Sequence, residues 1–565
     1  MASGGYSEDG GMDELPLSQA DVAALRTPAA ALAMERRLHG RKNGDANDGP
    51  SKAKMFNDPV HGHFRVDPLL VSVIDTPQFQ RLRDLKQLGT SHFVFPGAVH
   101  TRFDHSLGVA HLSDVFVRRI EVGQKSLNIT FDDIQVVRLA GLVHDLGHGP
   151  FSHVFDNEFL PAVGFPKGGF VHEKMSCDIL DLLVDENNID IDKDTLDRVK
   201  EVVMSSEVDM IGPDGRHKWG DKGFLCEFVA NGRNSIDVDK FDYMMRDCFY
   251  SGVKASCDFS RLMEQVKVIG GEMCWKASEA DNIYELFHTR ASLHRRIYTH
   301  KKAKAIEFMV TDALAAANPV LRITDKVSDP RDFWKLDDTV LKQIEQMPEE
   351  PALEDAKGIM HRIRTRDLYT HVNEVVIPPE RLPHWLNRKV LPEEIITCTP
   401  HEFADAKLTA ADVRVNNMKI NYCKKDAHGR SINPVDCVRF FSDMTDQTSF
   451  LIPKDKVSSM MPAHFEERRV RVYCSTSRKS DDYQRKCEAL AAAFEKFQEQ
   501  EGMRDQQVHR TPLKQQRKRQ RSDASLAGPG EDTPHSAHTG TYVGDRQRQL
   551  QGQRLFARGL GNGMQ

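Results

Sequence analysis

Residues 140–156 read AGLVHDLGHGPFSHVFD and join the end of an apolar segment to a polar, glycine-rich one. Residues 136–143 are apolar nearly all round, which predicts a buried helix ending at the glycines and proline of 147–150. Three histidines and a carboxylate stand at this helix end, namely His144, Asp145, His148 and His153. Unpaired ionisable groups would be costly there unless hydrogen-bonded or bound to a metal. Because imidazoles and carboxylates suit iron, manganese or zinc, the stretch predicts a metal site.

In the rest of the chain, the spacing of apolar residues predicts a mainly α protein. Further helical spacing occurs at 174–186, 236–248, 281–302 and 305–317. Strand-like alternation is confined to short pieces, mainly 411–422, 436–442, 448–452 and 469–474. We therefore expect a helical catalytic core at 51–390, followed by a smaller α+β region at 391–500.

Both ends of the chain differ in composition from this block. Residues 1–50 are rich in Gly, Ala, Asp and Ser, which predicts a disordered leader. Residues 501–565 shift to Gln, Arg, Gly and Ser and are expected to form a disordered basic tail. Its run KQQRKRQR at 514–521 is typical of a nuclear import signal or a polyanion contact, although a solvated charge run is the alternative. We expect a nuclear protein, with the cytosol as a second location.

The composition excludes several classes of protein. The 565 residues carry 77 Lys plus Arg and 83 Asp plus Glu, a net charge of −6. No apolar stretch approaches the roughly 18 residues of a membrane-spanning helix, so no membrane partner is expected. The N-terminus lacks the basic and apolar regions of a secretion signal. None of the ten cysteines forms a C-x-x-C pair, which argues against a zinc ribbon or a disulfide scaffold and favours a reducing compartment.

A second group of polar residues occurs at 236–247, IDVDKFDYMMRD. On a helix, Asp239, Tyr243 and Asp247 share one face and Lys240 borders it. Two acids, a phenol and a lysine on one face resemble a site for metal, phosphate and sugar. The alternative is a solvent-facing stripe of salt bridges, but apolar residues cover the other faces.

A third group lies at 288–302, HTRASLHRRIYTHKK. Helical spacing places Arg290, His294 and Tyr298 on one face, with two lysines beyond. Such a face can bind a polyphosphate and stack on a base or sugar. An exposed basic helix is the alternative interpretation.

These residues carry a resemblance to a known family. His105, His144-Asp145 and Asp239 match the H…HD…D signature of the HD-domain metal-dependent phosphohydrolases. The strings NDPVHGH (57–63), VFPGAVHTRFDHSLGV (94–109), AGLVHDLGHGPFSHVFD (140–156), IDVDKFDY (236–243) and FHTRASLHRR (287–296) resemble the deoxynucleoside triphosphate triphosphohydrolases of animals and plants. The animal members place a sterile-alpha-motif domain before the HD domain. The first 53 residues are too few and too polar for it, so a form without that module is expected.

The resemblance implies an all-helical HD-domain fold and a set of site residues. The metal would be bound by His105, His144, Asp145 and Asp239. The triphosphate would contact Arg102, Lys240, Tyr243 and Arg290, and the deoxyribose would contact Gln87, Asp247 and Tyr298. Leu88 and His294 would complete the substrate site. His153 would be the general acid, oriented by Asp156, with His148 and His172 supporting the attacked phosphate or the water.

The implied reaction is attack of water on the α-phosphorus of a dNTP, releasing a deoxynucleoside and inorganic triphosphate. A tyrosine ring beneath the sugar would leave no room for a 2′-hydroxyl. The implied cofactors are iron, zinc or manganese at the HD site and Mg²⁺ with the nucleotides.

The resemblance also implies regulation by GTP and dNTP binding, which assembles a homotetramer in exchange with a dimer. Lys54, Asp75, Gln80, Arg83 and Phe103 fall on the guanine-nucleotide positions. Asn57, Val94, Phe95, Arg261, Asn282, His300 and Lys301 fall on the neighbouring dNTP positions. The chain departs from the animal pattern at Gln265, Lys276, Ser278 and Thr299.

Two other functions compete with this one. An HD-type phosphodiesterase or 5′-nucleotidase would need less positive charge than Arg102, Lys240 and Arg290 provide. A nucleic-acid-binding protein on an HD scaffold is disfavoured because the chain is acidic overall, whereas duplex binders are usually strongly basic. The basic tail still permits weak binding of single-stranded nucleic acid.

Overall fold

The structure is a computed structural model that describes residues 53–166, 168–208, 210, 217–385, 388–421, 424–425, 431–458 and 464–503. All of these residues belong to one compact unit. The expected leader and the basic run at 514–521 lie outside the described residues. Within the described ranges, none of the helices combines the length and the apolar composition needed to cross a membrane.

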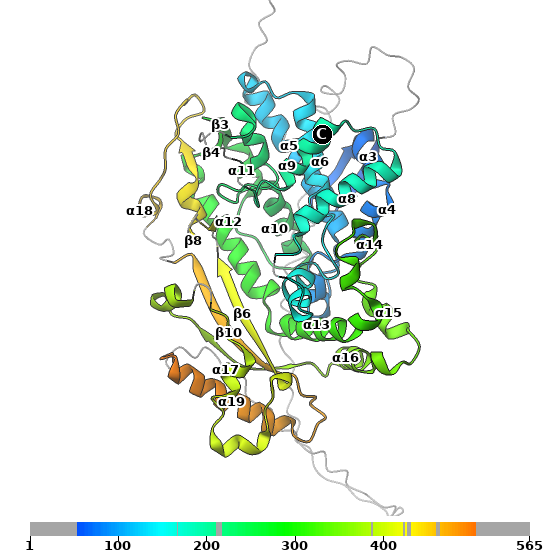
Figure 1. The fold of residues 1–565 in the computed structure, drawn as a ribbon. Coiled ribbons are helices and arrows are strands. Elements are labelled where there is room, and N and C mark those ends of the chain that lie inside the picture. Colours follow the sequence, from blue (N-terminus) through cyan, green and yellow to red (C-terminus); the bar gives the residue numbers. More distant parts are fainter. Residues whose placement is uncertain are drawn as a thin grey trace, which may run out of the picture. The chain divides into compact units, whose positions relative to one another are not determined.

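The fold is mainly helical, as the sequence predicts (Figure 1). Its larger helices are α3 (Pro68–Ile74), α5 (Arg102–Gly123), α6 (Phe131–Val143), α8 (His172–Asn187), α9 (Lys193–Val203), α10 (Val238–Ser251), α12 (Ala280–Leu293), α13 (Lys301–Leu321), α15 (Val340–Gln346), α16 (Glu354–Arg364) and α19 (Tyr483–Gln500). Shorter helices are α4 (Pro77–Gln80), α7 (Leu160–Ala162), α11 (Phe259–Glu264), α14 (Pro330–Phe333), α17 (Pro392–Ile396) and α18 (Lys454–Val457).

Helices α5, α6 and α10 form the centre of the helical core. Helix α5 packs along α6, α10 packs on α5, and α9 covers α6. Phe116 of α5 contacts Phe228 and Phe241, with ring centroids 4.9 and 6.5 Å apart, and all three side chains are fully buried. Burying a side chain of this size stabilises a fold by about 1.5–3 kcal/mol, so these contacts fix the helices that carry the polar site.

Helix α6 begins at a capping box and ends earlier than the sequence suggests. The Oγ1 atom of Thr130 accepts a hydrogen bond from the backbone of Asp133, whose carboxylate accepts one in return. The helix ends at Val143, so His144 and Asp145 lie in the turn that follows rather than within the helix. A Cβ atom on Gly147 would lie 2.1 Å from the carbonyl oxygen of His172. This close approach of the loop to α8 explains the glycine.

Within the part of the chain that the structure describes, ten strands form small sheets. They are β1 (Lys54–Asp58), β2 (Gly62–Val66), β3 (Val266–Ile269), β4 (Glu272–Lys276), β5 (Thr370–Val376), β6 (Val413–Asn421), β7 (Lys424–Lys425), β8 (Ser431–Ile432), β9 (Arg439–Phe441) and β10 (Glu466–Cys474). Strand β10 pairs antiparallel with both β5 and β6, and Figure 1 shows β6 and β10 side by side. Helices α17 and α19 pack on this sheet.

Strands β1 to β5, β7 and β8 were not predicted from the sequence. Strand β5, THVNEVV, buries the polar residues Thr370, His371, Asn373 and Glu374 along with Val372 and Val375. Because both kinds of residue are buried, the strand lacks the polar and apolar alternation that identifies a half-buried strand. In contrast, the expected piece at 448–452 forms only an isolated bridge, between Phe440 and Phe450.

The predicted continuous helix at 281–302 is wrong. Helix α12 ends at Leu293, one π-helical turn covers His294–Tyr298, and α13 starts at Lys301. His300 caps α13, since its Nδ1 accepts a hydrogen bond from the backbone of Lys302 at 3.3 Å. The apolar periodicity continues through this break, so the sequence does not indicate where helix α12 ends.

Candidate active site

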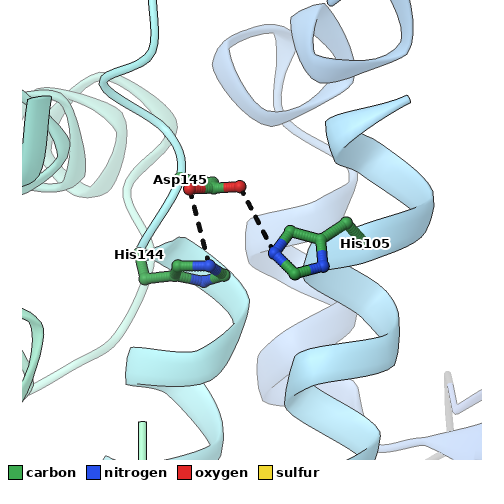
Figure 2. Close-up of side chains that lie close together, drawn as sticks. All are labelled: His105, His144 and Asp145. Atoms are coloured by element: carbon green, nitrogen blue, oxygen red, sulfur yellow. Dashed lines mark ion pairs between the residues drawn. The ribbon is translucent and has the colours of Figure 1, made fainter. Parts of the chain in front are cut away.

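The first part of the site is a cluster of imidazoles and carboxylates between α5, α6 and α10. His105 comes from the first turns of α5, while His144 and Asp145 follow the end of α6 (Figure 2). One carboxylate oxygen of Asp145 lies 3.5 Å from Nε2 of His105, and the other lies 3.5 Å from Nε2 of His144. The ligand atoms of the three residues all lie within 4.8 Å of one another.

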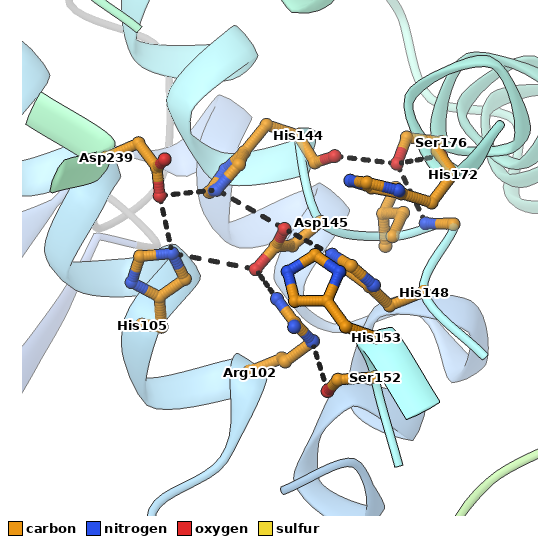
Figure 3. Close-up of polar contacts among 12 residues, drawn as sticks. Arg102, His105, His144, Asp145, His148, Ser152, His153, His172, Ser176 and Asp239 are labelled. Atoms are coloured by element: carbon orange, nitrogen blue, oxygen red, sulfur yellow. Dashed lines mark hydrogen bonds and ion pairs between the residues drawn. The ribbon is translucent and has the colours of Figure 1, made fainter. Parts of the chain in front are cut away.

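Asp239 completes this group from the first turn of α10. Its Oδ1 atom lies 3.1 Å from Nε2 of His105 and 3.6 Å from Nε2 of His144 (Figure 3). Asp237 is the N-cap of α10 and accepts a hydrogen bond from the backbone of Lys240 at 3.1 Å, which starts the helix at this point. The structure thus brings together His105, His144, Asp145 and Asp239, which we call the four-ligand cluster.

The four-ligand cluster fits a divalent cation. The Nδ1 atom of His144 lies 2.9 Å from the carbonyl oxygen of Gly141, while its buried Nε2 has no hydrogen-bond partner among the described residues. Burial alone would lower the pKa of His105, but Asp239, Asp242 and Asp145 raise it to about 10. Burial raises the pKa of Asp145, but the charges of Arg102, His144 and His148 together outweigh it and hold this pKa well below its usual range. A pocket with so strong a preference for positive charge suits a metal.

A second layer of residues orients His105. Oδ2 of Asp242 lies 2.7 Å from Nδ1 of His105, and Oδ1 lies 2.5 Å from Nε2 of His61. Arg246 donates to both oxygens of Asp242 at 2.8 Å. A Cβ atom on Gly108 would lie 1.9 Å from Oδ1 of Asp242, so only glycine fits there. This arrangement turns Nε2 of His105 toward Asp145 and Asp239, where a cation would bind.

The residues of this layer were not predicted from the sequence. Asp242 lies within the string IDVDKFDY and His61 within NDPVHGH. The spacing of Asp242 and Arg246, one helical turn apart, was a usable signal for an ion pair. The contact with His61 joins residues 181 positions apart, which no local pattern indicates.

A second group, the histidine cluster, consists of His148, His153, His172 and Asp156. The rings of His148 and His172 stack with centroids 4.0 Å apart. Asp156 Oδ2 lies 3.3 Å from Nδ1 of His172 and 3.9 Å from Nδ1 of both His148 and His153. Nε2 of His148 lies 3.3 Å from Oδ1 of Asp145, so the histidine cluster adjoins the four-ligand cluster (Figure 3).

The histidine cluster lies on segments that are tied to one another. Ser176 Oγ donates to the carbonyl oxygens of His144 and His172 at 2.7 and 2.9 Å, and it accepts from the backbone of Gly147 at 2.8 Å. The side chain of His153 is the most open of the cluster, at 65% exposure. Desolvation of the ring by the protein atoms around it, followed by the charges of Arg102 and His172, lowers the pKa of His153. The free protein therefore holds this ring in its neutral form at pH 7.

Arg102 lies between the two clusters rather than at an open surface. Its Nη1 pairs with Oδ2 of Asp145, and its Nε donates to Ser152 Oγ at 2.8 Å. Ser152 Oγ in turn donates to the carbonyl oxygen of Lys86 at 3.0 Å. Arg102 was predicted to contact the triphosphate, and in the structure its guanidinium pairs with Asp145, a predicted metal ligand.

The other predicted substrate residues form two groups. Tyr298 donates to Asp247 Oδ2 at 2.5 Å and contacts the ring of His294, with centroids 4.9 Å apart. Oδ1 of Asp247 lies 2.7 Å from Nε2 of His100, a residue that the sequence analysis did not assign.

Around Tyr243, burial raises the pKa of the phenol, and the charges of Arg290 and Lys240 act against this effect. Lys240 pairs with Asp237 at 3.0 Å, and Arg290 donates to the carbonyl oxygen of Asn421. Burial, followed by the charge of Arg290 and by that of His153 when it is protonated, lowers the pKa of His294 to about 3, so these three side chains lie in one region.

Two further predicted residues lie on the segment after Lys86. The side-chain oxygen of Gln87 is buried without a hydrogen-bond partner among the described residues. Leu88 is partly buried and packs against the core.

The residues predicted to bind regulatory nucleotides form local groups. Lys54 donates to Asp75 Oδ1 at 2.6 Å, and both side chains are 47% exposed. Arg83 donates to Gln80 at 2.8 Å and stands over the ring of Phe103 at 3.6 Å.

In the second predicted nucleotide site, Arg261 and Asn282 both contact Glu279, at 2.7 and 3.3 Å. His300 contacts the ring of Phe95, with centroids 5.4 Å apart, and Lys301 pairs with Glu374 at 3.0 Å. Val94 packs against the core, and Asn57 pairs with His63 in the β1–β2 hairpin. The roles of these residues remain predictions.

Comparisons with known proteins agree with this geometry. Residues 102–210 match the HD domain family, which places the protein in the class of HD-domain proteins. The chain is 41% identical over 446 residues to the deoxynucleoside triphosphate triphosphohydrolase SAMHD1 homolog of Dictyostelium discoideum, covering 79% of this chain and 80% of that relative. It is 37% identical over 448 residues to human deoxynucleoside triphosphate triphosphohydrolase SAMHD1, covering 74% of this chain and 70% of that protein. The chain belongs to the SAMHD1 family, which confirms the resemblance seen in its sequence.

Proposed function

We propose that the protein is a metal-dependent deoxynucleoside triphosphate triphosphohydrolase that converts a dNTP and water into a deoxynucleoside and inorganic triphosphate. The observation that carries this proposal is the four-ligand cluster beside the histidine cluster, in a chain whose relatives bear that name. A divalent metal held by His105, His144, Asp145 and Asp239 would polarise the α-phosphate and lower the pKa of the attacking water, with Mg²⁺ accompanying the triphosphate.

The histidine cluster supplies the proton that the leaving group needs. The attacking water gives one proton to the solvent as its oxygen bonds to the α-phosphorus; the bond to the 5′-oxygen breaks, and His153 protonates that oxygen. Nδ1 of His153 faces Asp156, so Nε2 is the atom that donates. The negative charges of a bound triphosphate oppose the cations that lower the pKa of His153 and favour its protonated form. His148 and His172 support the attacked phosphate or the water.

The cationic residues near Tyr243 bind the triphosphate, and the Tyr298–Asp247 pair binds the sugar. The hydrogen bond from Tyr298 to Asp247 fixes the ring, because a buried phenol with one strong acceptor has one preferred orientation. We propose that this ring lies beneath the deoxyribose and excludes a 2′-hydroxyl. Gln87, with its buried unpaired oxygen, is a partner for the 3′-hydroxyl.

We further propose that GTP and dNTPs activate the enzyme by promoting a homotetramer. Half-exposed Lys54 and Asp75 support a guanine site, since a carboxylate can accept hydrogen bonds from guanine N1–H and its amino group. The basic run at 514–521, outside the described residues, supports nuclear import as a further proposal. Loss of nuclear accumulation when 514–521 is deleted tests it, and a cytosolic intact protein would contradict it.

Product analysis tests the main proposal. The protein is incubated with dGTP, with dATP plus GTP, and with ATP, and released phosphates are separated by chromatography. We expect inorganic triphosphate and deoxynucleoside from the first two mixtures and no release from ATP. Orthophosphate or pyrophosphate as product would indicate a phosphodiesterase or nucleotidase instead. Binding of single-stranded nucleic acid without hydrolysis, unaffected by His144→Ala, would indicate a nucleic-acid-binding protein.

A further inference from the structure

Asp338, which lies just before α15, joins two segments of the active site. Its Oδ1 accepts a hydrogen bond from the backbone N–H of Phe151 at 2.6 Å, and its Oδ2 accepts one from the backbone N–H of Lys86 at 2.9 Å. These segments are 187 and 252 positions away in the sequence. One carboxylate therefore uses both oxygens to hold two loops side by side.

Arg81 reinforces the same junction from the other direction. Its Nε donates to the carbonyl oxygen of Leu336 at 2.7 Å. Its two terminal nitrogens donate to the carbonyl oxygens of Leu146 and His148 at 3.0 and 2.7 Å. The segment from Leu336 to Asp338 thus contacts both the 81–86 segment and the loop that follows α6.

The loop held by Asp338 has an unfavourable backbone. Phe151 and Ser152 have φ angles of 61° and 58°, in the left-handed region that residues with a Cβ rarely adopt. Such a conformation is strained and persists only where the surroundings impose it. A charged acceptor at the N–H of Phe151 is a constraint of this kind.

Each loop carries predicted active-site residues immediately after its contact with Asp338. His153 follows the left-handed pair, while Gln87 and Leu88 follow Lys86. The loops also touch directly, because a Cβ atom on Gly89 would lie 2.7 Å from the carbonyl oxygen of Phe151. A shift of either loop would therefore change the distance between the proton donor and the sugar-binding segment.

We propose that Asp338 is a positioning residue for catalysis, which places the Nε2 of His153 against the 5′-oxygen of the substrate. This inference rests on the proposed function. Asp338 does not touch the substrate itself and acts through the backbone of Phe151 and Lys86.

The electrostatics agree with this role. Partial burial raises the pKa of Asp338 to about 6, and the carboxylate of Asp337 contributes to the rise, while Lys86 acts against it. The guanidinium of Arg81 is also close enough to interact with both acids. At pH 7.5 the carboxylate is ionised and accepts both hydrogen bonds.

The test compares two substrates in the full-length protein. One is dGTP, and the other is a dGTP analogue with sulfur in place of the 5′-bridging oxygen. A thiol of pKa about 8.5 leaves without general-acid help, whereas an alkoxide does not. In Asp338→Asn, we expect dGTP turnover to fall between about 10- and 100-fold, because a displacement near 1 Å at a reacting group has costs of this size. Turnover of the sulfur analogue should change by less than about threefold.

Asp337→Asn is the matched control. Its carboxylate accepts a hydrogen bond from the backbone of Thr339 at 2.8 Å. It accepts none from either loop among the described contacts. Asp338→Glu is a second variant, which keeps the charge but moves the oxygens by one methylene group, and it should show the same selective loss. Metal content should equal that of the wild type in all three.

Equal losses with both substrates, or wild-type turnover of dGTP in Asp338→Asn, would overturn the proposal. Loss of folding in both Asp338 variants would overturn it too, since Asp338 would then hold the fold rather than the site. If wild-type protein released no triphosphate from either substrate, the proposed function would be at fault. The two failures are therefore distinguishable.

Discussion

Nδ1 of His105 lies 2.7 Å from Oδ2 of Asp242, and this contact decides which nitrogen of the ring can bind a cation. With Nδ1 hydrogen-bonded, only Nε2 faces Asp145 and Asp239. Asp242 is itself held by Arg246 and His61 and has no exposed surface. The orientation of a predicted metal ligand is thus set by a residue outside the four-ligand cluster.

Asp242→Asn should therefore weaken metal binding. Loss of such an outer carboxylate costs about 10- to 100-fold in affinity, because the ring loses its fixed tautomer and orientation. Metal content after dialysis against a graded series of chelator concentrations measures this loss. Asp58→Asn is the control, since Asp58 pairs with the same Arg246 at 2.8 Å but does not contact His105. A comparable metal loss in both variants would mean that Arg246, rather than the contact with His105, controls the site.

His153→Ala should abolish most turnover while leaving metal content near normal. General acid catalysis contributes on the order of 10²–10⁴-fold, and we expect a loss in this range with dGTP. The sulfur-bridged analogue should recover most of that loss, because its leaving group needs no proton. The control is His288→Ala, which makes the same substitution at an exposed histidine of α12. An unchanged rate in His153→Ala would show that another group donates the proton.

Much of the four-ligand cluster could be predicted because its residues lie at helix ends that the sequence marks clearly. The apolar run before His144 and the polar face from Asp239 each identify one helix and one position on it. Convergence of His105 with these residues followed from the family resemblance and not from spacing. Distances of this kind depend on how α5, α6 and α10 pack, which is not encoded locally.

The break between α12 and α13 and the contacts of Asp338 could not be predicted. In the first case the apolar period continues through His294–Tyr298, so a π turn and a straight helix look alike in sequence. In the second, a single aspartate before a short helix is typical of an N-terminal cap. Only the folded chain brings Lys86 and Phe151 to its two oxygens.

Stability should decrease as the pH falls from 7 to 5, and His111 should account for part of this. Burial, followed by the charge of His61, lowers the pKa of His111 to about 4, below the value of about 6.5 in an unfolded chain. At pH 7 the imidazole of His111 is mostly neutral in both the folded and the unfolded protein. Between pH 6.5 and 4 only the unfolded protein binds a proton at this residue, and this proton binding shifts the equilibrium toward unfolding. Phenylalanine can replace the ring, which stacks on Phe64 with centroids 4.4 Å apart.

Urea unfolding of wild type and His111→Phe at pH 7 and pH 5.5 measures this effect. The variant should lose less unfolding free energy on acidification, by about 1 kcal/mol for this interval. An identical loss in both proteins would assign the pH dependence to other groups.

Asp75→Ala should raise the GTP concentration needed for half-maximal dATP hydrolysis. One charge-assisted hydrogen-bonding group is worth about 1.5–3 kcal/mol, which corresponds to a shift of at least tenfold. The control is Asp325→Ala, which removes a surface ion pair with Arg322 of similar exposure. Activation by GTP that is unchanged in Asp75→Ala would remove this residue from the guanine site.

Discrimination between deoxyribose and ribose should depend on the ring of Tyr298 rather than on its hydroxyl. Tyr298→Ala opens the space beneath the sugar, so the ratio of kcat/KM for dATP over ATP, measured with GTP present, should fall at least about tenfold. Tyr298→Phe keeps the ring and loses only the hydrogen bond to Asp247. It should retain the ratio within about threefold while raising KM, because Oδ2 of Asp247 loses its donor and only Oδ1 stays paired, with His100. If both variants lost discrimination equally, Asp247 would be the group that reads the sugar, and the tyrosine would serve only to hold it in place.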